Sequence, residues 1–307
     1  MAIVFLLFNE DNNPMSKNVV IKANSFGPYK AYRKPKDSTL KFGTYFEKSV
    51  LLPFDTTAER MIRVWLPSGY GDDPKKRYPV IYMSDGQNLV DRAMSAYGDW
   101  HLDKVVHSLM KDEHLPGVIL VGIDCPKNPV RRCNELNPPY RVRRSFSHIR
   151  GPNHPYGNKF VDYIVNDLKP EIDKYFLTMP DLMHTGIGGS SMGGIMAFYA
   201  YMAYPDTFGF SLAFSIPTFA YSKKRWKELI EEWKFDPFTH RKLAMWVGGK
   251  GFERNFTRGN KWMVKYLKKL GMDDHNLHFE CNTSLPHHEE AWYTYSFGAL
   301  RFFLKDC

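Results

Sequence analysis

Short apolar runs alternate with longer amphipathic segments along the chain from about residue 40 onward. Apolar runs of about four to eight residues between turn-forming residues are typical of buried strands, and longer amphipathic segments are typical of surface helices. The predicted strands are 44–52, 60–66, 78–83, 118–123, 184–187, 210–214, 243–247 and 277–281. The predicted helices are 101–112, 159–174, 192–203, 223–233, 258–270 and 290–304.

The order of these segments predicts an α/β fold. The first two strands follow each other directly and are predicted to pair antiparallel, whereas helices separate the later strands. That order favours a mainly parallel central sheet with helices on both faces. The chain has 307 residues, of which 43% are hydrophobic, and can bury one large core. We therefore expect a single domain over 41–307, preceded by an N-terminal extension over 1–40.

The N-terminal residues and the cysteines bear on where the protein is located. The apolar run 2–8 has no basic residues before it and a polar stretch after it, so it predicts neither a secretory signal nor a membrane span. Met15 offers a second plausible start, so three interpretations of residues 1–14 stay open: an extra strand, a disordered leader or a start-site artefact. The four cysteines lack metal-site or C-x-x-C spacing and predict reduced thiols in a cytoplasmic protein.

A formal net charge of +9 raises the possibility of a nucleic-acid partner. No basic helix or known nucleic-acid module is evident in the sequence. We therefore expect neither a nucleic-acid nor a membrane partner, and the sequence gives no signal for the oligomeric state.

The strongest chemical signal is the heptapeptide at 188–194, Gly-Gly-Ser-Ser-Met-Gly-Gly. It places Ser191 in a G-x-S-x-G pattern between a short apolar run and a predicted helix. This context is typical of a nucleophile elbow, in which small neighbours allow a sharp turn that presents the serine hydroxyl. The alternative is a Gly-rich connection in another α/β domain. A phosphate-binding loop is excluded, because no Lys-Ser or Lys-Thr pair follows the glycines.

A serine nucleophile needs a base and an acid, which follow late strands in this kind of fold. His287 lies between the last predicted strand and the last helix, with His288 as the less favoured neighbour. Glu253 is the first carboxylate after the strand at 243–247 and is the candidate acid. The competing carboxylates are Asp236, Asp273 and Asp274.

Two backbone N–H groups are candidates for stabilising a developing oxyanion. The Gly-containing turn at 84–88 follows a buried strand and can direct one N–H toward a substrate oxygen. Met192, the residue after the candidate nucleophile, supplies the other. An ordinary Asp-Gly turn is the alternative reading of 84–88.

Together these residues resemble the putative-esterase family of α/β-hydrolases, which includes enterochelin, feruloyl and acetylxylan esterases, S-formylglutathione hydrolases and antigen 85 acyltransferases. The matching motifs are collinear over about residues 45–305. They are 60–67, 78–89, Trp100, 121–124, Arg132-x-x-Glu135, 169–173, 189–194 and His287-x-Glu289-x-x-Trp292.

The resemblance implies a role for each matched residue. Ser191 corresponds to the nucleophile, His287 to the base, and the backbone of Gln87 and Met192 to the oxyanion donors, with the acid in the loop that holds Glu253. Two positions depart from the family pattern. The path to Glu253 is lengthened, and Ser84 stands where relatives often carry histidine.

The expected activity is hydrolysis of a carboxylic ester through an acyl-enzyme, without a metal or an organic cofactor. The alternatives are an acyltransferase with the same triad and a non-catalytic binding protein of this fold. The expected partner is a small-molecule ester.

A long predicted insert over 125–158 bears on the substrate. It contains seven basic residues and one acidic residue, and a basic cap over the strand ends suggests an anionic or sugar-linked substrate. The alternative is a solvated basic loop in which Arg132 and Glu135 pair with each other. The candidate substrate contacts are Asp85, Trp100, Arg132, Glu135 and Trp292.

Overall fold

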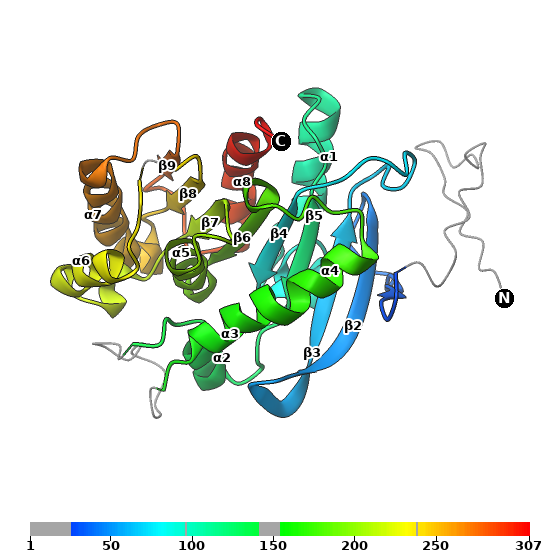
Figure 1. Cartoon of the computed structure of the whole chain (residues 1–307), viewed down its shortest axis with the longest axis horizontal. Helices are drawn as coiled ribbons and strands as arrows, with labels where there is room; N and C mark the ends of the chain where they lie inside the picture. Colours follow the sequence, from blue (N-terminus) through cyan, green and yellow to red (C-terminus); the bar gives the residue numbers. More distant parts are fainter. Residues whose placement is uncertain (1–25, 96, 141–153, 238) are drawn as a thin grey trace.

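The computed structural model describes residues 26–95, 97–140, 154–237 and 239–307. These residues form one nine-stranded sheet with helices on both faces (Figure 1). The strands are β1 (Lys30–Ala31), β2 (Thr44–Leu52), β3 (Asp55–Leu66), β4 (Val80–Ser84), β5 (Ile119–Ile123), β6 (Thr185–Ser190), β7 (Phe210–Phe214), β8 (Lys242–Val247) and β9 (Leu277–Cys281). The helices are α1 (Leu102–Asp112), α2 (Pro129–Glu135), α3 (Gly157–Tyr163), α4 (Lys169–Tyr175), α5 (Met192–Ala203), α6 (Lys223–Glu232), α7 (Arg254–Leu270) and α8 (Glu289–Leu304).

The strand order is β1-β2-β3-β5-β4-β6-β7-β8-β9. The pairs from β1 to β5 are antiparallel, and every pair from β5 to β9 is parallel. This confirms the predicted mainly parallel sheet with antiparallel opening strands. Because β4, β6, β7, β8 and β9 point the same way, the loops that follow them meet at one edge of the sheet.

Alternate residues of the central strands are buried on opposite faces, as strand geometry requires. Val80 and Tyr82 of β4 belong to a core shared with α5, α6 and α7, whereas Ile81 and Met83 belong to a second core shared with α1 and α8. Burial on both faces explains why these strands are continuous apolar runs in the sequence.

The helix boundaries differ from the predictions at three places. The predicted helix 159–174 is α3 and α4, joined by a π-helical turn at Ile164–Leu168. Helix α7 begins at Arg254 instead of 258, because Phe256 is buried and holds the polar first turn in place. Helix α2 was not predicted, although Asn128 caps it and Pro129 is its first residue.

Part of the predicted organisation lies outside the described residues. This applies to residues 1–14 and to 141–153 of the predicted insert, including Arg141, Arg143, Arg144 and Arg150. The division into 1–40 and 41–307 therefore stays a prediction. Phe26 and Tyr29 of the extension pack against Phe176, with ring centroids 5.3 Å apart in each pair.

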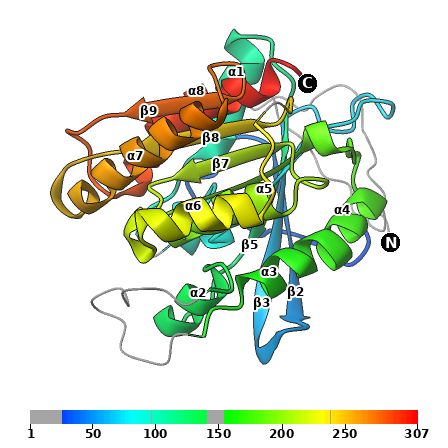
Figure 2. The same cartoon turned by 60° about the vertical axis from the view of Figure 1, so that its left-hand side comes forward.

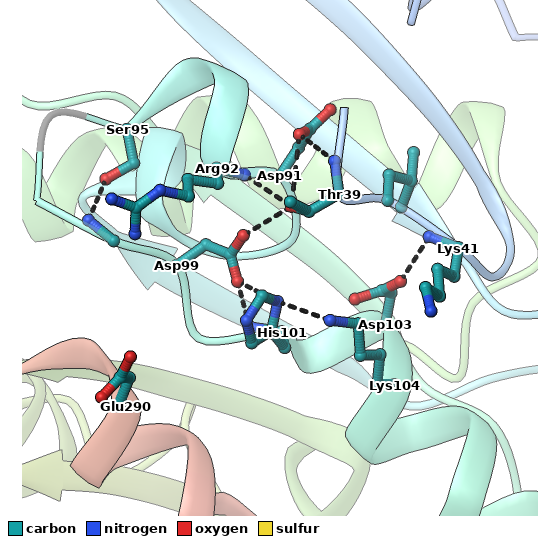
Figure 3. A network of polar contacts seen from close by, with 12 residues as sticks. Thr39, Lys41, Asp91, Arg92, Ser95, Asp99, His101, Asp103, Lys104 and Glu290 are labelled. Carbon is teal, nitrogen blue, oxygen red and sulfur yellow. Dashed lines mark hydrogen bonds and ion pairs between the residues drawn. The ribbon is translucent and has the colours of Figure 1, made fainter. Parts of the chain in front are cut away.

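Three buried carboxylates fix the segment before β2 onto the loop that leads into α1 (Figure 3). Asp91 accepts a hydrogen bond from the Thr39 N–H at 2.9 Å, and the Thr39 hydroxyl donates to Asp99 at 2.7 Å. Asp103 accepts from the Lys41 N–H at 2.9 Å, and burial raises its pKa. The loop that carries Trp100 is thereby joined to the segment that leads into β2.

Close backbone approach requires glycine at the start of α5. A Cβ on Gly194 would lie 2.2 Å from the carbonyl oxygen of Phe214, at the end of the neighbouring β7. A Cβ on Gly193 would lie 2.2 Å from Ser84 Oγ, at the end of β4. Both contacts are shorter than van der Waals separation, so these glycines allow α5 to start between the two strand ends.

We expect Gly194→Ala to lower the free energy of unfolding by about 1–3 kcal/mol, because a backbone atom blocks the new methyl group. Helix propensity alone would give the opposite sign, a gain of about 1 kcal/mol. Gly298→Ala in α8 is the matched control, since its Cβ would meet side-chain atoms instead of backbone, namely the flexible end of Glu280 at 2.4 Å and His278 Nε2 at 3.1 Å. Urea unfolding of both variants measures the difference, and equal stabilities would contradict the packing argument.

Candidate active site

Ser191 lies at the turn between β6 and α5, at the carboxyl edge of the sheet. Its backbone angles, φ 56° and ψ −117°, are sparsely populated for a residue with a side chain. The Ser191 N–H donates to the Phe214 carbonyl of β7 at 2.9 Å, which holds the turn. This is the strained strand-to-helix turn that the G-x-S-x-G pattern predicts.

Glu253 and His287 meet at the same edge, on the loops after β8 and β9. The Glu253 side chain is fully buried, and its Oε2 is hydrogen-bonded to His287 Nδ1. The N–H groups of Gly249 and Lys250 both donate to the Leu285 carbonyl, at 3.0 and 2.9 Å, so the two loops are joined through their backbones. The contact is fixed by the strand order, because β8 and β9 are neighbours.

The lengthened path to Glu253 is taken up by a single 3-10 turn over Gly251–Glu253. Gly251 has φ +60°, which favours glycine at that position. Of the competing carboxylates, Asp274 pairs with Lys268 and Asp273 accepts the His275 N–H, and both are exposed. Glu253 is the carboxylate that contacts His287 among the described residues.

Ser215 completes the surroundings of Glu253, and the sequence reasoning missed it. It follows β7 directly, has φ 50° and is fully buried. Its hydroxyl donates to Glu253 Oε1 at 2.7 Å and accepts a hydrogen bond from Trp292 Nε1 at 3.0 Å. The Gly248 N–H also donates to Oε1, at 3.0 Å. Its position directly after a buried strand is a signal that the sequence contains, because side chains at strand ends form the site in this fold.

Three aromatic rings enclose the imidazole of His287. Its centroid lies 4.7 Å from that of Phe256, 5.1 Å from that of Trp292 and 5.4 Å from that of Phe252. The Trp292 ring stands edge-on, at 86° to the imidazole plane. Only 15% of the His287 side chain is exposed, so the rings and Glu253 hold it in one orientation. His288 instead caps α8 through its side chain.

The two candidate oxyanion donors lie at the starts of helical turns. Met192 is the first residue of α5, where a backbone N–H has no acceptor within its own helix. Gln87 lies in the 3-10 turn Gly86–Asn88 after β4. Its side-chain oxygen accepts the Cys125 N–H at 3.2 Å, and its side-chain nitrogen contacts Cys125 Sγ at 3.2 Å. The turn after β4 is thereby tied to the end of β5.

Asp85 and Arg132 form a bidentate ion pair beside the elbow, with N–O distances of 2.7 and 2.6 Å. Burial alone raises the pKa of Asp85, but the Arg132 guanidinium outweighs it, and the pKa lies below its usual value. Glu135 is paired with Arg60 at 3.0 Å, and its burial raises its pKa. The alternative in which Arg132 and Glu135 pair with each other is therefore wrong.

The structure does not favour three of the five predicted substrate contacts. Glu135 is 1% exposed and forms a buried ion pair with Arg60, so a substrate cannot reach it. Trp100 and Trp292 are 3% and 5% exposed, and their rings pack on each other with centroids 5.5 Å apart. The two tryptophan rings therefore pack beneath His287 as part of the core, since Trp292 contacts its imidazole. Asp85 and Arg132 neutralise each other, with 27% of the Arg132 side chain exposed.

Comparisons with known proteins agree with this geometry. The family model described as putative esterase matches residues 55–280. The chain belongs to the putative esterase family. Membership in this family gives the reaction class, which is carboxylic ester hydrolysis.

Individual relatives are distant in sequence. The uncharacterized protein YbbA of Bacillus subtilis is 23% identical over 239 residues, which cover 75% of this chain and 87% of YbbA. Among solved structures, the siderophore hydrolase EstA from Aspergillus nidulans has a TM-score of 0.68 at 16% identity, covering 91% of this chain and 99% of that chain. The IroE-like serine hydrolase from Shewanella oneidensis has a TM-score of 0.66 at 23% identity, covering 85% and 80%. These structures establish the shared α/β-hydrolase fold.

Within the described ranges, no helix has the length and apolar character needed to cross a membrane. The same residues contain no group of three or more His, Cys, Asp or Glu side chains placed to hold a metal ion.

We expect Ser215→Ala to lower kcat about tenfold with little change in KM, because Glu253 loses one hydrogen bond of about 1–1.5 kcal/mol that helps to hold it against His287. Ser211→Ala in β7, the strand that Ser215 follows, is the matched control, since its buried hydroxyl donates to the Ala197 carbonyl at 3.1 Å. Steady-state kinetics with a p-nitrophenyl ester and thermal melts separate the two effects. Equal kcat values for the two variants would show that the Ser215 hydroxyl does not contribute to catalysis.

Proposed function

We propose that this esterase uses Ser191 as nucleophile, His287 as general base and Glu253 as the acid that orients the imidazole. The observation that carries the proposal is the buried Glu253 carboxylate bonded to His287 Nδ1, at the same sheet edge as the strained turn of Ser191. A carboxylate on Nδ1 leaves Nε2 as the nitrogen that can accept a proton. The three residues follow the chain order serine, acid, histidine of this fold.

The mechanism begins with attack of Ser191 Oγ on the ester carbonyl carbon while His287 Nε2 takes the hydroxyl proton. The carbonyl oxygen becomes an oxyanion, which the N–H groups of Met192 and Gln87 stabilise in our proposal. The carbonyl re-forms, the C–O bond to the alcohol breaks, and His287 protonates the leaving alkoxide. Water then repeats the sequence on the acyl-enzyme and releases the carboxylic acid and free Ser191.

The Glu253 carboxylate stabilises the imidazolium that forms in each step. Its Oε1 accepts hydrogen bonds from Ser215 and Gly248, so Oε2 remains directed at His287. A fixed carboxylate does not have to reorganise when the charge appears on the imidazole.

The substrate is proposed to be a small-molecule ester with an anionic or sugar-linked part. A solved structure of the same fold is a siderophore hydrolase, which supports a small-molecule substrate. Of the basic residues predicted for the insert, Arg131 pairs with Asp55 and Arg132 pairs with Asp85. Within the described ranges, the unpaired positive charge of that segment is therefore that of Lys127, which is exposed.

We also propose a reducing, cytoplasmic environment. The four cysteines are free thiols in the structure, which supports this proposal.

Replacing Ser191 by alanine is expected to abolish turnover of a p-nitrophenyl ester, because no other group supplies the attacking oxygen. A fluorophosphonate probe is expected to label the wild-type protein at Ser191 and to leave the variant unlabelled. Mass spectrometry of the labelled peptide identifies the site. A variant that keeps its activity, or a label on another serine, would refute the assignment.

Glu253→Gln is expected to reduce kcat/KM by roughly 10²- to 10⁴-fold, since the amide is isosteric but carries no charge to stabilise the imidazolium. Asp274→Asn makes the same chemical change at an exposed carboxylate and serves as the control. The comparison requires unchanged melting temperatures. If Asp274→Asn lost activity while Glu253→Gln stayed fully active, Asp274 and not Glu253 would be the acid of the triad.

A further inference from the structure

Much of the excess positive charge of this protein lies on one helix. The chain carries a formal net charge of +9, and α7 contains six basic residues and no acidic residue over its 17 positions. We call these six side chains the α7 basic ridge. The ridge consists of Arg254, Arg258, Lys261, Lys265, Lys268 and Lys269.

The spacing of the ridge places its charges on one side of the helix. From Arg254 to Lys268 the basic residues follow each other at intervals of four, three, four and three positions, and such positions share a helical face. Lys269 follows Lys268 directly and widens the row at its end. All six are exposed, whereas Phe256, Met263 and Leu267 on the opposite side are buried in the core. At 1.5 Å per residue, the row is about 22 Å long.

Helix α6 widens this surface. It lies beside α7 on the same face of the molecule (Figure 2). Lys223 Nζ lies 5.4 Å from the ring centroid of Trp262, and Lys227 Nζ lies 5.4 Å from that of Tyr266. The two rings are parallel within 4°, with centroids 5.7 Å apart, so they hold a second, shorter row of charge next to the ridge.

Neighbouring acids leave most of this charge uncompensated. Within the part of the chain that the structure describes, Lys268 is the one ridge residue in an ion pair, with the exposed Asp274 at 2.8 Å. On α6, Glu228 pairs with Lys224 and Arg225, and Glu232 pairs with Arg225. Clustered like charges raise the local potential and attract an anionic partner.

An exposed aromatic ring lies at the start of the ridge. Phe252 is 54% exposed and precedes Arg254 by two residues. Its ring contacts Phe256 and His287, with centroids 5.2 and 5.4 Å away. The ridge therefore starts at the rim of the active site, next to an apolar group that the protein does not cover.

We propose that the α7 basic ridge and Phe252 form a docking surface for an anionic lipid bilayer. A bilayer surface accommodates both features, since its anionic headgroups attract lysine and arginine while its interface accepts an aromatic ring. A soluble anionic polysaccharide would neutralise the ridge but would offer Phe252 no apolar environment. The apolar face of α7 is occupied by the protein core, so the helix lies on the surface and does not insert.

This proposal goes beyond ester hydrolysis and revises the expectation, drawn from the sequence, that the protein has no membrane partner. That expectation rested on the lack of an apolar span. The statement that no basic helix is evident, which was the ground for expecting no nucleic-acid partner, is wrong, because α7 carries six basic residues and no acidic residue. Docking through the ridge would place the His287 end of the site at the lipid surface, where amphiphilic esters accumulate.

The test is co-sedimentation of the full chain with vesicles of phosphatidylcholine containing phosphatidylglycerol, compared with vesicles of phosphatidylcholine alone. The ridge variant replaces Lys261, Lys265, Lys268 and Lys269 by glutamine and leaves the two arginines nearest the site in place. The control variant replaces Lys36, Lys75, Lys111 and Lys159 by glutamine. These four are exposed on other parts of the surface, so both variants lose the same charge.

We expect the wild-type and control proteins to bind the anionic vesicles, and the ridge variant to bind at least roughly tenfold more weakly. Binding should also fall between about 50 and 300 mM salt, where screening shortens the reach of the charges. Equal binding by the two variants, or equal binding to neutral vesicles, overturns the proposal. Ridge-dependent binding to single-stranded DNA or polygalacturonate without binding to vesicles assigns the surface to a soluble polyanion and also overturns it.

The binding assay does not depend on turnover, so its result tests the docking surface independently of the proposed ester hydrolysis. Both quadruple variants are expected to hydrolyse a soluble p-nitrophenyl ester at the wild-type rate, because neither contains a change at the triad. Vesicle binding by a protein without esterase activity would refute the proposed catalytic roles and leave the docking surface intact.

Discussion

The buried carboxylate of Glu253 is the interaction on which the arrangement of the site depends. It joins the ends of three neighbouring strands: Ser215 after β7 and Gly248 after β8 donate to one oxygen, and His287 after β9 bonds to the other. A buried charge is costly unless its oxygens are satisfied, and here each is. Any shift in one loop would leave part of that charge unpaired, which ties the loops to one geometry.

The same sheet edge concentrates backbone strain. Asp85, Ser191 and Ser215 have positive φ angles of 55°, 56° and 50°, and they directly follow β4, β6 and β7. These angles cost free energy for residues with side chains, so the surrounding contacts must hold them. The Ser191 and Ser215 N–H groups donate to the end of the next strand along the sheet, at 2.9 and 2.8 Å. Three adjacent sharp turns thus open one edge to a substrate.

Charge in this protein is used in two different ways. Near the site, positive side chains are matched: Arg60 lies between Asp55 and Glu135, and Arg132 is held by Asp85. These pairs attach α2 to the sheet and shape the wall beside the elbow. Along α7 the positive side chains are exposed and largely unmatched. Composition reports only the sum, whereas the fold separates structural charge from charge that is free to interact.

The fold class, most strand positions, the turn at Ser191 and the esterase family can all be predicted from the amino-acid sequence, because apolar periodicity and the Gly-rich elbow are local patterns. Tertiary structure decided which partners meet. The contact between Glu253 and His287, the place of Ser215 between Glu253 and Trp292, and the separate pairing of Arg132 and Glu135 join residues from distant parts of the chain. Strand order brings such residues together, and a linear pattern does not contain strand order.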